Sequence, residues 1–182
     1  ESTVLYADKP HLFKQRAHLD GQSLIIPRVS SERRRYIPIG FLDSCTIISD
    51  SAQAVYDANY FIFGIITSYV HMLWAKTIGG KLETRYRYTN LCYNSFPFPK
   101  INEEQKERLS ALAENILLTR ENHTEMTLGE MYNPESMPQD LKYAHQAMDI
   151  AVEQCYRPEP FTSEEERLEY LFKLYEKMTK KK

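Results

Sequence analysis

The segment from Asp50 to Gly80 limits more strongly than any other what this chain can fold into. Its middle, residues 60–74, is so apolar that a helix formed there must be covered on almost every side. Asp50 or Ser51 is a candidate N-cap, and the glycine pair at 79–80 is a typical helix stop. Polar residues interrupt the run before it reaches the roughly 18 apolar residues of a membrane span. We therefore predict one long helix buried in a protein core, and no membrane partner.

The chain before this helix contains short runs of β-branched and aromatic residues. They are residues 3–7, 23–29, 35–42 and 45–49. Pro, Gly, Asp and Ser bound these runs, as is typical of strands and their turns. Pro27 and Pro38 lie inside two of the runs, and because proline cannot donate to a sheet ladder, these strands belong at edges or bulges. The pattern predicts a small, irregular mixed sheet packed on the long helix.

Beyond Pro97 and Pro99 the apolar spacing becomes helical throughout. Three amphipathic segments follow, at residues 102–122, 137–157 and 162–182. Asn102 is the predicted cap of the first segment. With 182 residues, 42% of them hydrophobic, the chain can bury a substantial core. We predict an α+β fold: a recognition-type domain at residues 1–98, followed by an all-α helical bundle domain at residues 99–182.

The two predicted domains differ in charge. Residues 1–98 contain 11 Lys and Arg against 8 Asp and Glu, and residues 99–182 contain 12 against 17, so net charges of +3 and −5 sum to −2. Such asymmetry predicts different partners for the two halves. The three cysteines are widely spaced and form no C-x-x-C pair, which favours a reducing cytoplasm over a disulfide framework or a zinc site. Because the chain begins at Glu1 without Met, we expect it to be a piece of a longer protein.

Motifs for catalysis are missing from the sequence. The six glycines form no G-x-G-x-x-G loop, and the five histidines are scattered without an i, i+4 pair. We therefore expect no complete active site within this chain. A small hydrolase using His71 or Cys92 is the least favoured of the alternatives.

The segment "GGKLETRYRYTN", residues 79–90, alternates charged with apolar or neutral side chains. In an extended strand this alternation sends Glu83, Arg85 and Arg87 to one face and Leu82, Tyr86 and Tyr88 to the other. A carboxylate accepts from cytosine N4 and a guanidinium donates to guanine O6 and N7, so Glu83 and Arg85 suit the reading of a C·G pair. A solvated strand with surface ion pairs would show the same pattern.

A second basic segment, "RVSSERRRYIP" at residues 28–38, predicts a loop between strands that contacts DNA phosphates. The predicted backbone-contacting residues are Arg28, Ser30, Ser31, Arg33, Arg34, Arg35 and Lys81. Such a loop would supply affinity for the DNA backbone, while residues 83–87 would supply sequence discrimination. The main alternative is a protein-interaction adaptor whose acidic helical bundle binds another protein.

Four stretches, taken in order, carry a resemblance to a known family. They are "LIIPRVSSERRRYIPIGFL", "YFIFGIITSYVHMLWAKTIGGKLETRYRY", "YNSFPFP" and "MYNPESMPQDLKYAHQAMDIAVEQCY". Together they resemble the carboxy-terminal part of the MmeI-like (type IIL) restriction-modification enzymes. The resemblance implies a target recognition domain followed by a helical domain, which binds double-stranded DNA but is not catalytic by itself.

The same resemblance implies roles for residues and for the parent protein. Glu83 and Arg85 would read one base pair, and Arg87, Asp50 and Ser51 would be further base-reading positions. The parent would join this chain to upstream methyltransferase and nuclease domains. It would methylate adenine N6 with S-adenosylmethionine and would use Mg2+ if it also cuts DNA.

Overall fold

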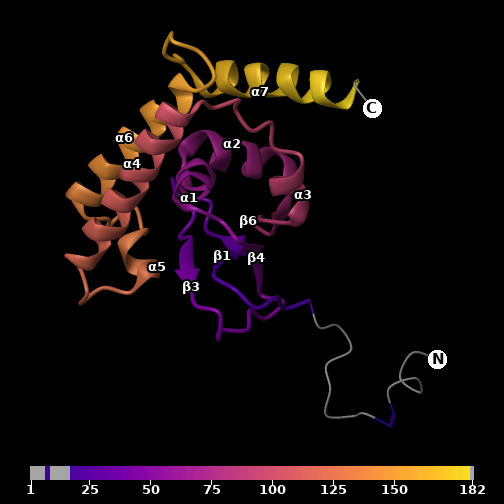
Figure 1. Ribbon diagram of the computed structural model, residues 1–182, viewed down its shortest axis with the longest axis vertical. Coiled ribbons are helices and arrows are strands. Elements are labelled where there is room, and N and C mark those ends of the chain that lie inside the picture. Colours follow the sequence, from indigo (N-terminus) through magenta and orange to yellow (C-terminus); the bar gives the residue numbers. More distant parts are fainter. Residues whose placement is uncertain (1–6, 9–16, 181–182) are drawn as a thin grey trace.

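The computed structural model describes residues 7–8 and 17–180. Except for Ala7, the strand predicted at residues 3–7 lies outside the described residues, as do the last two lysines. Figure 1 shows the strands in the lower part of the molecule, two helices at its centre, and a layer of further helices along one side and across the top.

The described residues form two small antiparallel sheets. In the first, β1 (Ser23–Pro27) lies between β3 (Gly40–Leu42) and β4 (Ala52–Tyr56). In the second, β6 (Arg85–Arg87) lies between β2 (Val29–Ser30) and β5 (Lys81–Leu82). The α+β class is confirmed, but two antiparallel sheets replace the single mixed sheet that the sequence predicted.

Strand β4 takes the place of the strand predicted at residues 45–49. Residues 45–49 form a loop in which the side chain of Ile47 is 72% exposed, so this β-branched run is not buried in a sheet. The segment Ala52–Tyr56, which the sequence had placed at the start of the long helix, pairs along β1 instead. The prediction that Asp50 or Ser51 caps a helix is therefore wrong, because both residues precede a strand.

The predicted long helix consists of two shorter ones, α1 (Tyr60–Thr67) and α2 (Tyr69–Ile78). Asn59 is the N-cap of α1, and its side chain accepts a hydrogen bond from the backbone N–H of Ile62 at 3.1 Å. Ser68 has extended backbone angles, ends α1 and begins α2. Among the described residues no single helix is long and apolar enough to cross a membrane. Only α1 and α2 taken together have that length and apolar content, and the two helices are bent by 61° relative to each other.

The remaining helices are α3 (Asn90–Asn94), α4 (Glu103–Glu121), α5 (Leu128–Met131), α6 (Gln139–Gln154) and α7 (Glu164–Thr179). Helices α4 and α6 lie side by side and cover α1, while α7 crosses the top of the molecule (Figure 1). The predicted cap of α4 is confirmed: the Asn102 side chain accepts from the N–H of Gln105 at 2.8 Å, and the Gln105 side chain accepts from the N–H of Asn102 at 3.0 Å.

The helical layer and the strand-rich part share one core. A single cluster of buried apolar side chains includes Phe63 and Ile66 of α1, Leu109 of α4 and Met148 of α6. Gly64 allows this contact, since a Cβ there would lie 2.7 Å from the terminal carbon of Met148. The burial of α1 thus holds α4 and α6 in place by the hydrophobic effect.

Candidate nucleic acid interface

Residues 81–87 form a β-hairpin and not the single strand predicted. Lys81 pairs with Tyr86 and Leu82 with Arg85, which leaves Glu83 and Thr84 as a two-residue turn. Glu83 has a φ of 56°, in the left-handed region that costs a non-glycine residue about 1 kcal/mol. The acid therefore lies at the tip of a projecting two-stranded ribbon.

The hairpin changes which side chains share a face. Paired residues of an antiparallel ladder point to the same side, so Leu82 lies with Arg85. The prediction that Leu82 shares a face with Tyr86 is wrong, since Leu82 pairs with Arg85 and its side chain is 47% exposed. Arg85 and Arg87 still share one face and are exposed, while Tyr86 between them is half-buried. The two turn residues belong to neither strand, so Leu82 and Arg85 point to the same side, whereas a single strand would place them on opposite faces.

Two tyrosines anchor the hairpin to α2. Tyr88 is 3% exposed, and its hydroxyl hydrogen-bonds Nε2 of His71 at 2.8 Å. Burial lowers the pKa of His71 to about 3, so this imidazole is neutral at physiological pH. The ring of Tyr86 has the ammonium groups of Lys76 and Lys81 within 5.1 and 5.5 Å of its centroid, which are cation–π distances. The contact of Lys76 with Tyr86 was not predicted, because it joins α2 to the hairpin across the fold.

Glycines at the end of α2 bring the helix against the hairpin. A Cβ on Gly79 would lie 1.9 Å from the carbonyl oxygen of Arg87, so only glycine fits there without movement. Gly80 has a φ of 72°, and its carbonyl accepts from the N–H of Arg87 at 3.1 Å. Gly79 thus serves a contact inside the protein, between the end of α2 and β6.

Glu83 and Arg85 are paired with each other at the tip. Arg85 donates to a carboxylate oxygen of Glu83 at 2.8 Å, and the two side chains are 53% and 73% exposed respectively. An exposed ion pair contributes about 0–1 kcal/mol. The pair can therefore be exchanged for contacts to another molecule at little cost.

Arg28 links the turn at residues 50–51 to the end of the hairpin by hydrogen bonds. The guanidinium of Arg28 donates to the carbonyl of Asp50 at 2.7 Å, and the backbone N–H of Arg28 donates to the carbonyl of Ser51 at 3.1 Å. The carbonyl of Arg28 in turn accepts from the N–H of Tyr88 at 2.8 Å. The structure therefore brings the predicted base-reading positions of two distant segments together. We name this surface the hairpin face: Arg28, Asp50, Ser51, Glu83, Arg85 and Arg87. Lys81 pairs with Tyr86 and therefore lies on the other side of the ribbon.

The segment after β2, which the sequence predicted to bind phosphates, contacts the helical layer. Ser30 is 5% exposed, which does not fit a contact to DNA phosphate. Ser31 accepts from the N–H of Arg33 at 3.3 Å, and Arg33 forms an ion pair with Glu135. Arg34 donates to the carbonyl of Gly129 at 2.9 Å.

Arg35 also faces the helical layer. Its guanidinium lies 3.7 Å from the ring centroid of Tyr69 and 3.8 Å from a carboxylate oxygen of Asp149. In this structure the run Arg33–Arg35 therefore contacts the acidic helical part of the chain. The opposite net charges of the two halves of the sequence pointed to such a contact, but they did not show which residues would form it.

The described residues offer no site for catalysis by a metal. No group of three or more His, Cys, Asp and Glu side chains among them is placed to hold an ion. His71 and Cys92, the residues of the hydrolase alternative, are both fully buried.

Comparison with known proteins identifies the family. A family model described as the MmeI target recognition domain matches residues 1–100, and another described as the MmeI C-terminal domain matches residues 101–181. The chain belongs to the MmeI family. The two MmeI models meet close to the boundary predicted at 98–99, but that boundary stays a prediction because the buried core runs through it.

Two similar proteins are much longer than this chain. The chain is 43% identical over 173 residues to DNA methyltransferase A of Bacillus subtilis (strain 168), a match that covers 94% of this chain and 20% of that protein. A structure of the type IIL restriction-modification enzyme MmeI in complex with DNA matches with a TM-score of 0.93 and 38% identity, over 98% of this chain and 24% of that one. The chain thus spans about a fifth to a quarter of the relatives' length.

Proposed function

We propose that this chain is the sequence-reading module of a longer restriction-modification DNA methyltransferase. The observation that carries the proposal is the hairpin tip, which presents an acid and two guanidinium groups to solvent from a buried anchor. Membership of a family with a target recognition domain supports it, as do the relatives, one of them a DNA methyltransferase and the other solved with DNA. Adenine-N6 methylation with S-adenosylmethionine would be carried out by other parts of the longer parent.

A two-stranded ribbon has the right size to enter the major groove of B-DNA. There the carboxylate of Glu83 would accept from cytosine N4 while the guanidinium of Arg85 donates to guanine O6 and N7 of the same base pair. In the free chain these groups satisfy each other at 2.8 Å. Exchanging that pair for base contacts keeps both charges hydrogen-bonded, and it discriminates against a wrong base by about 1–3 kcal/mol.

The remaining residues of the hairpin face would extend the contact. Arg87 follows Arg85 on the same side of β6, and Asp50 and Ser51 lie beyond it next to Arg28. We propose that Arg87, Asp50 and Ser51 read neighbouring bases, while Arg28 and Lys81 bind phosphates. We no longer assign Ser30, Arg34 or Arg35 to the DNA backbone, because burial or contacts to other parts of the chain already engage them. Ser31 and Arg33 stay predicted phosphate contacts, since the ion pair of Arg33 with Glu135 is as exposed as that of Arg85 with Glu83.

Methyl transfer would belong to other domains of the parent, with S-adenosylmethionine as the methyl donor. Any cleavage, and the Mg2+ that it needs, would belong there as well. A DNA substrate and unpaired cysteines fit a cytoplasmic location.

Exchange of charge at the hairpin tip tests the proposal. The double variant Glu83→Lys with Arg85→Asp in the full-length parent should change the base recognised at one position of its methylated motif. Sequencing of methylated DNA from the host measures this directly. A matched control is Glu169→Lys with Lys173→Glu, which inverts an equally exposed ion pair on α7 and should leave the motif unchanged.

Two outcomes contradict the proposal. One is an unchanged motif in an active Glu83/Arg85 variant. The other is DNA binding that barely responds to salt, because phosphate contacts make affinity fall steeply as salt rises. Salt-insensitive binding to a protein would favour the adaptor alternative.

A further inference from the structure

A carboxylate of the helical layer is buried against the start of α2. Asp149 of α6 is 7% exposed. One of its oxygens accepts from the backbone N–H of Tyr69 at 2.7 Å, and the other accepts from the hydroxyl of Tyr36 at 2.7 Å. Tyr69 is the first residue of α2, and N–H groups in the first turn of a helix have no partner within the helix. Asp149 supplies that partner from a separate element, and its negative charge also suits the positive end of the helix dipole.

Arg35 completes this contact from the segment that follows β2. Its Nε donates to the hydroxyl of Tyr36 at 3.2 Å, and its guanidinium lies 3.8 Å from Asp149. The same segment is fixed to the helical layer by the contacts of Arg33 and Arg34 to Glu135 and Gly129. We name the group Arg35, Tyr36, Tyr69 and Asp149 the brace. Within it the partners of the buried carboxylate come from two segments of the recognition part: Tyr69 from α2, and Arg35 with Tyr36 from the segment after β2.

Two paths lead from the brace to the hairpin. The first is α2 itself, whose ten residues span about 15 Å and end at Gly79, packed against the carbonyl of Arg87. The second is β2, which precedes Arg35 in the chain and pairs with β6 through Val29 and Arg87. Both ends of these paths are hydrogen-bonded or close-packed, so a shift of α2 at the brace moves the hairpin with it.

We infer that the helical domain is part of the sequence reader: Asp149 is a positioning residue that fixes α2, and with it the orientation of Glu83, Arg85 and Arg87. This inference rests on the proposed function. It assigns the helical domain a role in discrimination between bases, although the acidic helices carry none of the base-reading side chains. It also implies that a recognition domain moved into another protein needs its own helical domain to keep its specificity.

The test compares Asp149→Leu with Asp149→Asn in the full-length parent. Leucine has the same number and branching of side-chain heavy atoms but accepts no hydrogen bond, whereas asparagine keeps an oxygen for the N–H of Tyr69. Affinity is measured for a duplex carrying the parent's own methylation motif and for a duplex with one base of the motif changed, at one salt concentration and well below each variant's unfolding temperature. The leucine variant should lose about tenfold or more in affinity for the motif and little for the changed duplex, and the asparagine variant should recover most of the loss.

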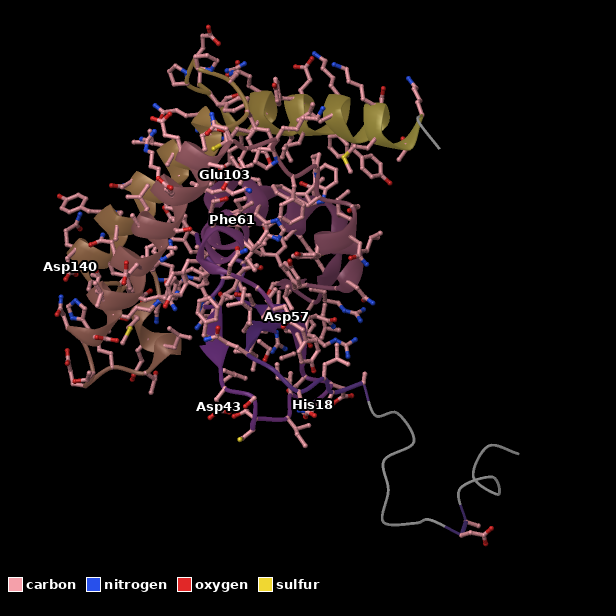
Figure 2. The ribbon with its side chains drawn as sticks, viewed as in Figure 1. His18, Asp43, Asp57, Phe61, Glu103 and Asp140 are labelled. Atoms are coloured by element: carbon pink, nitrogen blue, oxygen red, sulfur yellow. The ribbon has the colours of Figure 1, made fainter. Side chains whose placement is uncertain are left out.

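Tyr36→Phe provides a second test if the leucine variant does not fold. It removes one donor to Asp149 and keeps the ring. Backbone hydrogen exchange in residues 81–87 should then become faster than in the wild type, because the hairpin is less firmly placed. The matched control is Asp140→Asn on the same helix, an exposed carboxylate that accepts from His123 at the outer edge of the helical layer (Figure 2); it should change neither specificity nor exchange.

Equal weakening of both duplexes, or unchanged discrimination, in a folded Asp149→Leu variant would overturn the inference. So would Tyr36→Phe without any change of exchange in the hairpin. These results are distinguishable from failure of the proposed function. If the Glu83/Arg85 exchange alters the motif while the Asp149 variants do not affect discrimination, the hairpin reads DNA and only the brace has been misassigned.

Discussion

Replacement of Gly79 by alanine tests the contact on which the hairpin's position depends. The added Cβ would lie 1.9 Å from the carbonyl oxygen of Arg87, 2.8 Å from that of Ala75 and 2.9 Å from the sulfur of Cys92. Two of these neighbours are backbone atoms, which cannot rotate away as a side chain can. Gly79 has a φ of −73°, so alanine brings no conformational strain of its own and the effect is steric.

The size of the effect follows from two opposing contributions. Overpacking at a tight site costs about 1–3 kcal/mol, and more when the backbone must shift by about 1 Å or more. Alanine also restricts the unfolded chain, which stabilises by about 0.4–1 kcal/mol where the residue fits. Because the shortest contact is so far inside van der Waals distance, overpacking should cost about 3 kcal/mol, the upper end of its range, and we expect a net loss of about 2–3 kcal/mol.

Gly80 is the matched control, since it lies next to Gly79 at the same helix end. A Cβ on Gly80 would meet nothing within 4 Å, but the φ of 72° disfavours any other residue by about 1 kcal/mol. Urea unfolding of the wild type and both alanine variants should therefore rank the wild type highest and Gly79→Ala lowest. A Gly79→Ala variant as stable as Gly80→Ala would refute the steric reasoning, and with it the tight packing of α2 against β6.

Two further predictions concern helix starts and pH. Asn59→Ala should lower the free energy of unfolding by about 1 kcal/mol because it removes the N-cap of α1, whereas Ser51→Ala should cost only a few tenths; equal losses in urea unfolding would contradict the observed start of α1. Burial raises the pKa of Asp149 to about 6 from 3.8, despite the lowering effects of the Tyr69 N–H, the Tyr36 hydroxyl and Arg35, while Glu153 raises it slightly. The folded state therefore binds this proton more tightly, and the charged carboxylate reduces stability by up to about 3 kcal/mol above pH 6 and not at all below pH 4. Asp149→Asn should match the wild type near pH 4 and exceed it near pH 7 in urea unfolding, and a constant difference across this range would show that Asp149 does not titrate as expected.

The sequence by itself determined the elements that depend on local signals. Asn102 marks the start of α4 because an asparagine before two glutamates satisfies N–H groups of the first turn within the same segment. The apolar spacing of residues 139–154 and 164–179 likewise predicted α6 and α7, since one buried stripe is enough to specify such helices. The exposure of Arg85 and Arg87 on one face also followed from period-two alternation.

Long-range contacts decided the rest. The break between α1 and α2 falls at Ser68, where no glycine or proline marks it in the sequence. Asp149, from another part of the chain, holds this break by accepting from the N–H of Tyr69. The dipeptide Glu83–Thr84 is no typical turn sequence, yet the hairpin forms because β6 pairs with β2 on one side and Gly79 packs against it on the other.

The run Arg33–Arg35 makes the same point for electrostatics. Its composition revealed a positive charge that needs a partner, but a charge interacts with whatever lies nearest, and proximity between distant segments is a property of the fold. Local hydrogen bonding and apolar periodicity could therefore be read from the sequence. The pairing of distant groups, which shapes the hairpin and the brace, was set only when burial of α1 and α2 brought the two halves of the chain together.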